Sequence, residues 1–201
     1  MYKRWHYLYI CFRWGCQHEK IAIQSYKRIQ LKDHGSLQVE DAGFHIHPLY
    51  SFLGASPDAS ISCECCGEGI LEVKCPICVK DKTLAAEAEH QQSHHFCLEM
   101  RDNKLYLKEN HAYYYQVQLQ LACTNRKYCD FVVWRGTSKT TEELHIQRIF
   151  QNVTFIRNYV EKATIFFKNC ILPELVGKMY TAVVAQNYTE VRSQQQLFCF
   201  C

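Results

Sequence analysis

A predicted β-hairpin is the feature that most constrains how this chain can fold. Two short apolar runs, at residues 59–62 and 70–75, flank a turn that contains two glycines. This pattern is typical of a pair of adjacent strands. Successive side chains of a strand point to opposite faces, so Glu72 and Lys74 share one face of the second strand. The hairpin therefore places an acid and a base side by side on one surface.

The remaining periodicity predicts helices and strands on both sides of this hairpin. Helical spacing or composition marks residues 15–30, 80–95, 111–123 and 155–175, the last ending near Pro173. Strand-like runs occur at residues 105–107, 128–134 and 144–150, of which the last two are expected to pair. The order helix, hairpin, helix, hairpin, helix predicts one mixed α/β domain.

Size and composition place the chain among globular proteins. Its 201 residues can bury a core without disulfides, and 48% hydrophobic with 21% charged residues is typical of a folded domain. The thirteen cysteines are odd in number and scattered, which favours reduced thiols. The apolar run near the N-terminus is too short for a signal peptide or a membrane span. We expect an intracellular protein of the nucleus or cytoplasm, neither secreted nor membrane-bound.

The cysteines of the hairpin offer one interpretation of its chemistry. Zinc in structural sites takes four Cys or His ligands, often in C-x2-C pairs. The residues available for such a site are Cys63, Cys65, Cys66 and Cys78. Cys75, by contrast, alternates onto the strand face opposite Glu72, where a small apolar residue packs well. We do not expect structural Zn²⁺ at these cysteines, and such an ion would coexist with a carboxylate site.

The carboxylates of the hairpin offer a different interpretation. Asp58 and Glu72, with the Val73 backbone carbonyl, supply the oxygen ligands that Mg²⁺ prefers. Lys74 would hold an attacking water and balance the charge of a phosphate. Taken alone, this P-D…E-x-K pattern is weak, because an exposed hairpin with a surface Glu/Lys pair has the same residues.

Three stretches in a fixed order make the carboxylate interpretation specific. They are W-G-C-Q-H-E-K-I-A at 14–22, G-A-S-P-D at 54–58 with E-V-K-C-P thirteen residues later, and Y-Y-Y-Q-V-Q-L-Q at 113–120. Together they resemble the YqaJ-like viral recombinase family, which belongs with phage lambda exonuclease in the PD-(D/E)XK nuclease superfamily. The resemblance covers residues 14–176, with residues 1–13 as a short, truncated-looking lead and 177–201 as a tail. It implies an α/β fold with a restriction-endonuclease-like core, in which helices flank a central mixed β-sheet.

The resemblance also implies roles for individual residues. Glu19 matches the acid of the first helix, and Asp58 and Glu72 match the metal-binding acids beside the Val73 carbonyl. Lys74 matches the catalytic lysine. The substrate-binding residues that it implies are Tyr113, Gln116 and Gln118, which belong to one predicted helix. The helical spacing also places Gln120 on the same face as Tyr113 and Gln116, as part of an amide stripe.

The function implied is a Mg²⁺-dependent deoxyribonuclease, with Mn²⁺ as a substitute, that acts as an exonuclease on double-stranded DNA ends in recombination or repair. A homo-oligomer is left open by the sequence. Two departures from the family favour an alternative: a segment that grips the DNA end normally precedes the first motif, and Ala59 stands where glycine is usual. The alternative is a catalytically inactive domesticated fold that binds DNA or protein.

Overall fold

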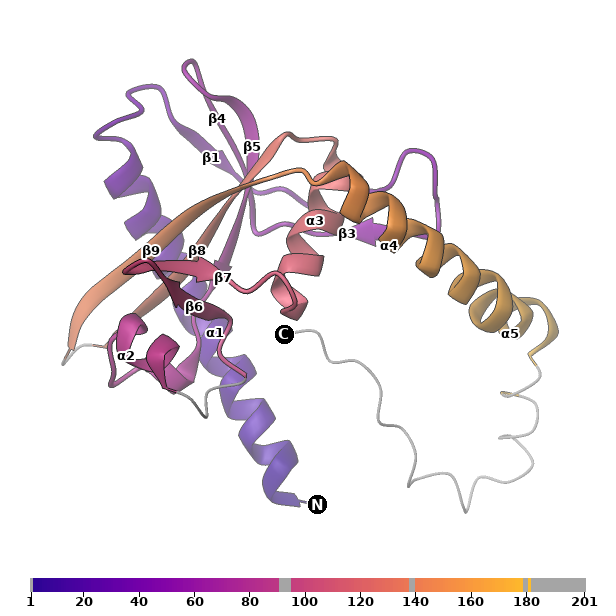
Figure 1. The fold of residues 1–201 in the computed structure, drawn as a ribbon, viewed down its shortest axis with the longest axis horizontal. Helices are drawn as coiled ribbons and strands as arrows, with labels where there is room; N and C mark the ends of the chain where they lie inside the picture. Colours follow the sequence, from indigo (N-terminus) through magenta and orange to yellow (C-terminus); the bar gives the residue numbers. More distant parts are fainter. Residues whose placement is uncertain (1, 91–94, 138–139, 179–180, 182–201) are drawn as a thin grey trace. The chain divides into compact units, whose positions relative to one another are not determined.

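The computed structural model describes residues 2–90, 95–137, 140–178 and 181 (Figure 1). The chain divides into two compact units, Met1–Gln151 and Asn152–Cys201, which are described separately. The first unit is built on a five-stranded sheet in the order β1-β4-β5-β8-β9. Its strands are β1 (Gln38–Glu40), β4 (Ala59–Cys63), β5 (Gly67–Lys74), β8 (Tyr128–Thr137) and β9 (Thr140–Phe150).

The sheet is mixed because its central pair, β5 and β8, is parallel, whereas the other neighbours are antiparallel. Parallel neighbours require a crossover connection. The crossover here includes helix α3 (Ala112–Thr124), which His111 caps by accepting from the Tyr113 N–H at 3.1 Å. The predicted mixed sheet with flanking helices is confirmed.

The predicted hairpin is confirmed, with one correction. Strand β4 pairs antiparallel with β5, in register from Ala59 opposite Leu71 to Cys63 opposite Gly67. The two glycines that were assigned to the turn lie within β5 instead. Gly69 is required there because a Cβ at this position would lie 2.4 Å from the Tyr128 ring on β8.

Helix α1 (Tyr2–Gln30) covers one face of the sheet (Figure 1). It begins well before residue 15, where the sequence predicted its start, because residues 2–14 contain neither proline nor glycine to stop it. The residues assigned to a separate lead are therefore helical from Tyr2 onward. Ala22 and Tyr26 are buried against Leu71 and Val73 of β5, so this face holds the apolar core.

Helix α3 covers the other face of the sheet, together with a small two-stranded sheet of β2 (His45–Ile46) and β3 (Gly54–Ala55). Its Val117 and Leu121 are fully buried. Asn125 ends the helix in the left-handed conformation, at φ 54°. The predicted helix at 111–123 is therefore confirmed almost to the residue.

The segment between β5 and α3 differs most from prediction. In place of one helix over 80–95, the chain forms a short 3-10 turn, η1 (Ile77–Val79), and helix α2 (Leu84–Glu89), while residues 91–94 lie outside the described part. Strand β6 (Leu98–Arg101), which was not predicted, pairs with β7 (Lys104–Leu107). Asp102 and Asn103 join them, both at positive φ, as a type I′ hairpin turn requires.

The second unit is a helical segment. Helix α4 (Val153–Phe166) continues through a π-helical stretch, η2 (Phe167–Ile171), into α5 (Leu172–Gly177). The predicted end near Pro173 is wrong. Pro173, which has no backbone N–H, lies two residues after the π-helical stretch, where the regular helical hydrogen bonding is interrupted, and the helix continues past it to Gly177. The predicted tail lies almost wholly outside the described residues.

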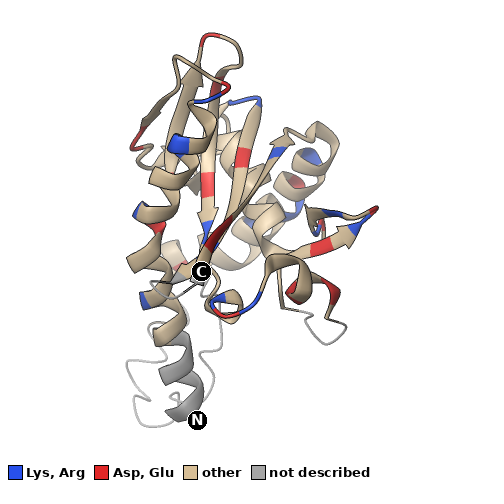
Figure 2. Cartoon of the chain, turned by 90° about the vertical axis from the view of Figure 1, so that its left-hand side faces the viewer, with Lys and Arg blue, Asp and Glu red and all other residues tan. Residues whose placement is uncertain are grey.

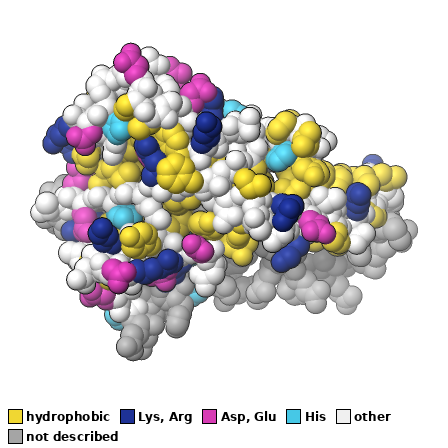
Figure 3. Space-filling model, turned by 45° about the horizontal axis from the view of Figure 1, so that its top comes forward, with side chains coloured by type: hydrophobic (Ala, Val, Ile, Leu, Met, Phe, Trp, Pro, Cys, Tyr) yellow, Lys and Arg dark blue, Asp and Glu magenta, His cyan; other side chains and the backbone are white. Residues whose placement is uncertain are grey.

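Charge is distributed without strong segregation on the face shown in Figure 3, where Lys and Arg side chains alternate with Asp and Glu. This agrees with a formal net charge of only +3.

None of the helices in the described ranges combines the length and apolar character needed to cross a membrane.

The close approach of Gly69 to Tyr128 gives a stability prediction. Gly69→Ala is expected to lower the free energy of unfolding by about 1–3 kcal/mol, because the added methyl overpacks against the ring. Gly15→Ala, in α1 with open space around the added methyl, is expected to raise it by about 0.5–1 kcal/mol. Urea unfolding of both variants measures the difference, and equal midpoints would contradict the proposed contact.

Candidate active site

The Glu72 carboxylate is the centre of the site. Glu72 lies on β5, and 1% of the residue is exposed. Figure 2 shows acidic residues at several positions along the strands of the sheet. Its Oε1 accepts from Lys74 Nζ and from Gln116 Nε2, both at 2.7 Å, and its Oε2 accepts from Gln120 Nε2 at 2.6 Å. These donors compensate for the desolvation of the buried charge.

Asp58 lies beside Glu72 because it directly precedes β4, and its own N–H donates to the Leu71 carbonyl at 3.1 Å. Its Oδ2 accepts from the Val73 N–H at 2.6 Å. Burial raises the pKa of Asp58 to about 7, and the negative charges of Glu72 and Glu19 also raise it, against the Val73 hydrogen bond and the cation of Lys74. Asp58 therefore lies in a concentration of negative charge.

Lys74 is held between the acid and an aromatic ring. Its side chain is 14% exposed, and Nζ lies 4.5 Å from the centroid of the Tyr113 ring. Burial alone would lower the pKa of Lys74, but the charges of Glu72 and Tyr113 raise it above its ordinary value. The side chain is therefore an ammonium donor at neutral pH and not a free amine.

Glu19 approaches from α1, on the opposite face of the sheet. Its residue is half-buried, and its charge raises the pKa of Asp58 and, after burial, that of Cys75. Since these two residues lie just before the start of β4 and just beyond the end of β5, Glu19 lies close enough to this end of the hairpin to affect both. The predicted acids thus gather at one end of the hairpin.

The predicted substrate residues of α3 separate into two sets. Gln116 contacts the Glu72 carboxylate and Tyr113 contacts Lys74. Gln118 is 1% exposed and donates to the Phe150 carbonyl at 3.0 Å, so this contact does not bring it to Glu72.

Gln120 is a site residue that sequence reasoning did not assign, although the predicted amide stripe included it. It follows Gln116 by four residues, the spacing that places two side chains on one helical face. Its Nε2 also lies 3.3 Å from the Ser56 carbonyl, and its Oε1 is buried without a hydrogen-bond partner in the described part of the chain.

The cysteines of the hairpin turn lie close together with one histidine. Within the described ranges, one group of three or more His, Cys, Asp and Glu side chains has ligand atoms all within 4.8 Å of one another. Its members are His34, Cys63, Cys65 and Cys66. Cys78, the fourth ligand considered from the sequence, lies in η1 and is not in this group.

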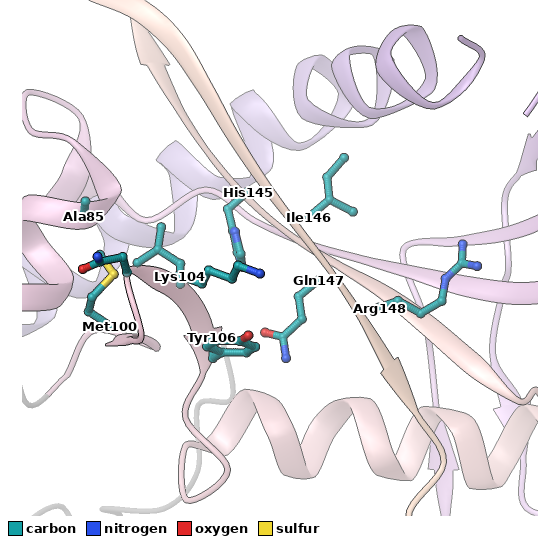
Figure 4. A pocket seen from close by; sticks show the side chains of 10 residues that line it. Ala85, Met100, Lys104, Tyr106, His145, Ile146, Gln147 and Arg148 are labelled. Atoms are coloured by element: carbon teal, nitrogen blue, oxygen red, sulfur yellow. The ribbon is translucent and has the colours of Figure 1, made fainter. Parts of the chain in front are cut away.

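An open pocket of about 530 Å³ lies elsewhere, between β9 and the β6–β7 hairpin (Figure 4). His145 and Gln147 leave β9 toward Lys104 and Tyr106. Gln147 also accepts from the Leu107 N–H at 2.7 Å, which ties β9 to the hairpin. Neither Glu72 nor Lys74 lines this pocket, so it is separate from the acid site.

A family model described as a YqaJ-like viral recombinase domain matches residues 9–127. The chain belongs to this family. The matched range contains Glu19, Asp58, Glu72 and Lys74 and the whole of α3, so the family resemblance seen in the sequence is confirmed. Curated protein sequences give no match to the chain.

Two solved structures share the fold. One is an alkaline exonuclease, LHK-Exo, from Laribacter hongkongensis, with a TM-score of 0.57, 21% identity, and coverage of 87% of this chain and 75% of that chain. The other is LHK-Exo in complex with dAMP, with a TM-score of 0.55, 22% identity, and coverage of 89% and 74%. The predicted restriction-endonuclease-like core is thereby confirmed.

The hydrogen bonds of α3 give a prediction that does not depend on activity. Gln120→Ala and Gln118→Ala remove equally buried amides, but one donates to a carboxylate and the other to a neutral carbonyl. We expect Gln120→Ala to cost about 1 kcal/mol more unfolding free energy, because hydrogen bonds to charged groups contribute more. Urea unfolding with chelator present tests this, and an equal or larger loss in Gln118→Ala would contradict it.

Proposed function

We propose that this chain is a metal-dependent deoxyribonuclease that degrades double-stranded DNA from its ends in recombination or repair, in the nucleus or cytoplasm. The observation that carries the proposal is the buried Glu72–Lys74 ion pair beside Asp58, at 2.7 Å between Nζ and Oε1. An acid and a lysine so placed suit phosphodiester hydrolysis, which needs both metal ligands and a cation near the phosphate.

The residues present fit a hard divalent cation. Asp58, Glu72 and Glu19 with the Val73 carbonyl would hold Mg²⁺, or Mn²⁺ in its place, since all four offer oxygen ligands. Burial and, after it, the negative charges of Glu72 and Glu19 raise the pKa of Asp58, and a bound cation would relieve the repulsion between these carboxylates. When bound, such an ion polarises the phosphoryl oxygen and activates a water molecule.

Lys74 supplies positive charge to the reacting phosphate. Because its pKa is raised, it remains protonated, and it donates hydrogen bonds to phosphate oxygens or orients the attacking water rather than abstracting a proton. Tyr113 restricts the ammonium from one side by contact through its ring. The lysine is thus oriented before the substrate binds.

Gln116 and Gln120 position the acid. They donate to different oxygens of Glu72, which fixes the plane of the carboxylate on β5. Donors that orient a ligand in this way are typical of metal sites. Gln116 is only partly buried, so it is also accessible to a DNA strand bound at the site.

The comparisons support DNA as the substrate. The family is that of a viral recombinase domain, and the structures of similar fold are of an alkaline exonuclease, one of them with dAMP bound. A deoxynucleoside monophosphate is the product that stepwise hydrolysis of a DNA end releases. We extend that substrate class to this chain.

Cleavage of end-labelled duplex DNA tests the catalytic roles. With Mg²⁺ present, Glu72→Gln and Lys74→Met are expected to lower the rate by at least about 100-fold, the effect of removing an electrostatic catalytic group. Chelator should abolish wild-type cleavage, and added Mg²⁺ should restore it.

Glu68→Gln is the matched control. Glu68 lies on the same strand and alternation face as Glu72, but its side chain is 64% exposed and pairs with Arg126 at the surface. The Glu68→Gln variant should cleave DNA at the wild-type rate. Full activity in Glu72→Gln and Lys74→Met would refute the assigned roles, and salt-sensitive DNA binding without cleavage by the wild type would favour an inactive binding module.

The end requirement is tested with matched substrates. We expect linear duplex to release mononucleotides, whereas the same sequence as a covalently closed circle stays intact because it offers no terminus. Gel analysis of both substrates separates the two modes. Linearisation of the circle at a comparable rate would instead indicate an endonuclease.

A further inference from the structure

The turn of the β4–β5 hairpin carries a second chemical cluster, at the end remote from the acids. Cys63 is the last residue of β4, and Cys65 and Cys66 form the turn that leads to β5. His34 reaches the cluster from the turn that follows α1. Two segments about 30 residues apart therefore place a nitrogen and three sulfurs together.

The ligand atoms lie near the corners of a tetrahedron. His34 Nδ1 is 3.6 Å from the sulfurs of both Cys63 and Cys66 and 2.9 Å from that of Cys65. The sulfur of Cys65 is 3.3 Å from that of Cys63 and 3.7 Å from that of Cys66. Tetrahedral Zn²⁺, with bonds of about 2.3 Å to sulfur and 2.0–2.1 Å to nitrogen, requires separations of about 3.8 Å and 3.6 Å.

We propose that this cluster is a structural zinc site of the Cys3His type. Three of the separations match the required ones to within about 0.1 Å, and the two shorter ones both involve Cys65, whose side chain is exposed and free to adjust. The ligands of the site are His34, Cys63, Cys65 and Cys66.

The turn has the backbone of a metal-binding knuckle. Cys63 and Cys66 have the C-x2-C spacing of zinc sites, and the Cys66 N–H donates to the Cys63 sulfur at 3.3 Å. Gly67 follows at φ 73°, a conformation that side chains disfavour. The chain thus curls around the position that a metal would take.

A cation supports the sulfurs from outside. Arg148 Nη1 lies 3.2 Å from the Cys66 sulfur, while its Nε and Nη2 donate to the buried Asp130 at 2.8 and 3.0 Å. Three thiolates around Zn²⁺ leave one net negative charge, which the guanidinium offsets. Such supporting contacts are typical of metal sites.

The zinc would be structural rather than catalytic. All four ligands come from the protein, so no open position remains for substrate. Asp58 precedes Cys63 by five residues along β4, which separates this site from the acids by roughly 16 Å. The ion would tie the turn after α1 to the hairpin, and thereby hold the helix that carries Glu19.

Metal analysis of the purified, reduced protein tests the proposal. We expect one zinc per chain, and substitution by Co²⁺ should give the thiolate charge-transfer and tetrahedral ligand-field absorption of a Cys3His site. Cys65→Ser and His34→Ala should lower zinc affinity by at least about 10-fold, and chelator should lower the Tm of the wild type by more than that of these variants.

Two controls isolate the site. Cys78→Ser removes an exposed cysteine outside the cluster and should retain zinc, and Glu72→Gln should retain zinc even though nuclease activity is lost. The proposal is overturned if the wild type has neither zinc nor thiolate–cobalt absorption, or if it has a disulfide within the cluster. Equal zinc affinity in Cys65→Ser and Cys78→Ser would also overturn it. The spectrum of the wild type decides the question even if a variant fails to fold.

Discussion

The buried carboxylate of Glu72 is the interaction on which the arrangement of the site depends. A charge at this depth without partners would cost several kcal/mol, so the lysine and the two amides that contact it are needed for folding as well as for chemistry. Because the amides come from α3 and the lysine from β5, the same contacts attach the helix to the sheet. Stability and site geometry therefore share one set of hydrogen bonds.

A second buried acid has the equivalent position on the other face of the sheet. Asp130 on β8 accepts from the Tyr26 hydroxyl of α1 at 2.7 Å and from Arg148 of β9. Each face thus has a buried carboxylate that accepts from the helix on that face. The two carboxylates differ in their surroundings. Asp130 accepts from a tyrosine and an arginine. Glu72 accepts from a lysine and two amides and also has the acid Asp58 beside it.

Much of the fold could be predicted from the sequence because it is encoded locally. Alternation identified the β4–β5 and β8–β9 hairpins, and helical spacing identified α3. The short strands β1, β2, β3 and β6 have too few residues to show an alternation of apolar and polar side chains. They are strands because their backbones pair with neighbouring strands, which the local sequence does not reveal.

The sites were predicted unevenly for the same reason. Family motifs supplied Glu19, Asp58, Glu72 and Lys74. Whether Gln118 or Gln120 contacts Glu72 depends on which face of α3 is turned toward β5, and the motifs do not specify this. His34 carries no local signal, since only the tertiary fold brings it to the cysteines. Cys78 has the right spacing from Cys75, yet the chain turns after Pro76 into η1 and leads it away.

The parallel pairing of β5 with β8 has a consequence for dissecting the protein. The family match ends at residue 127, directly before β8 begins at Tyr128. A chain shortened to that boundary would keep every assigned acid, yet β5 would become an edge strand with unpaired backbone groups. Phe131, Val132 and Val133, which are fully buried in β8, would be removed with it. Residues 9–127 define the family, but they lack β8. A shortened protein must therefore extend beyond residue 127 to cover β5 and prevent this strand from self-associating.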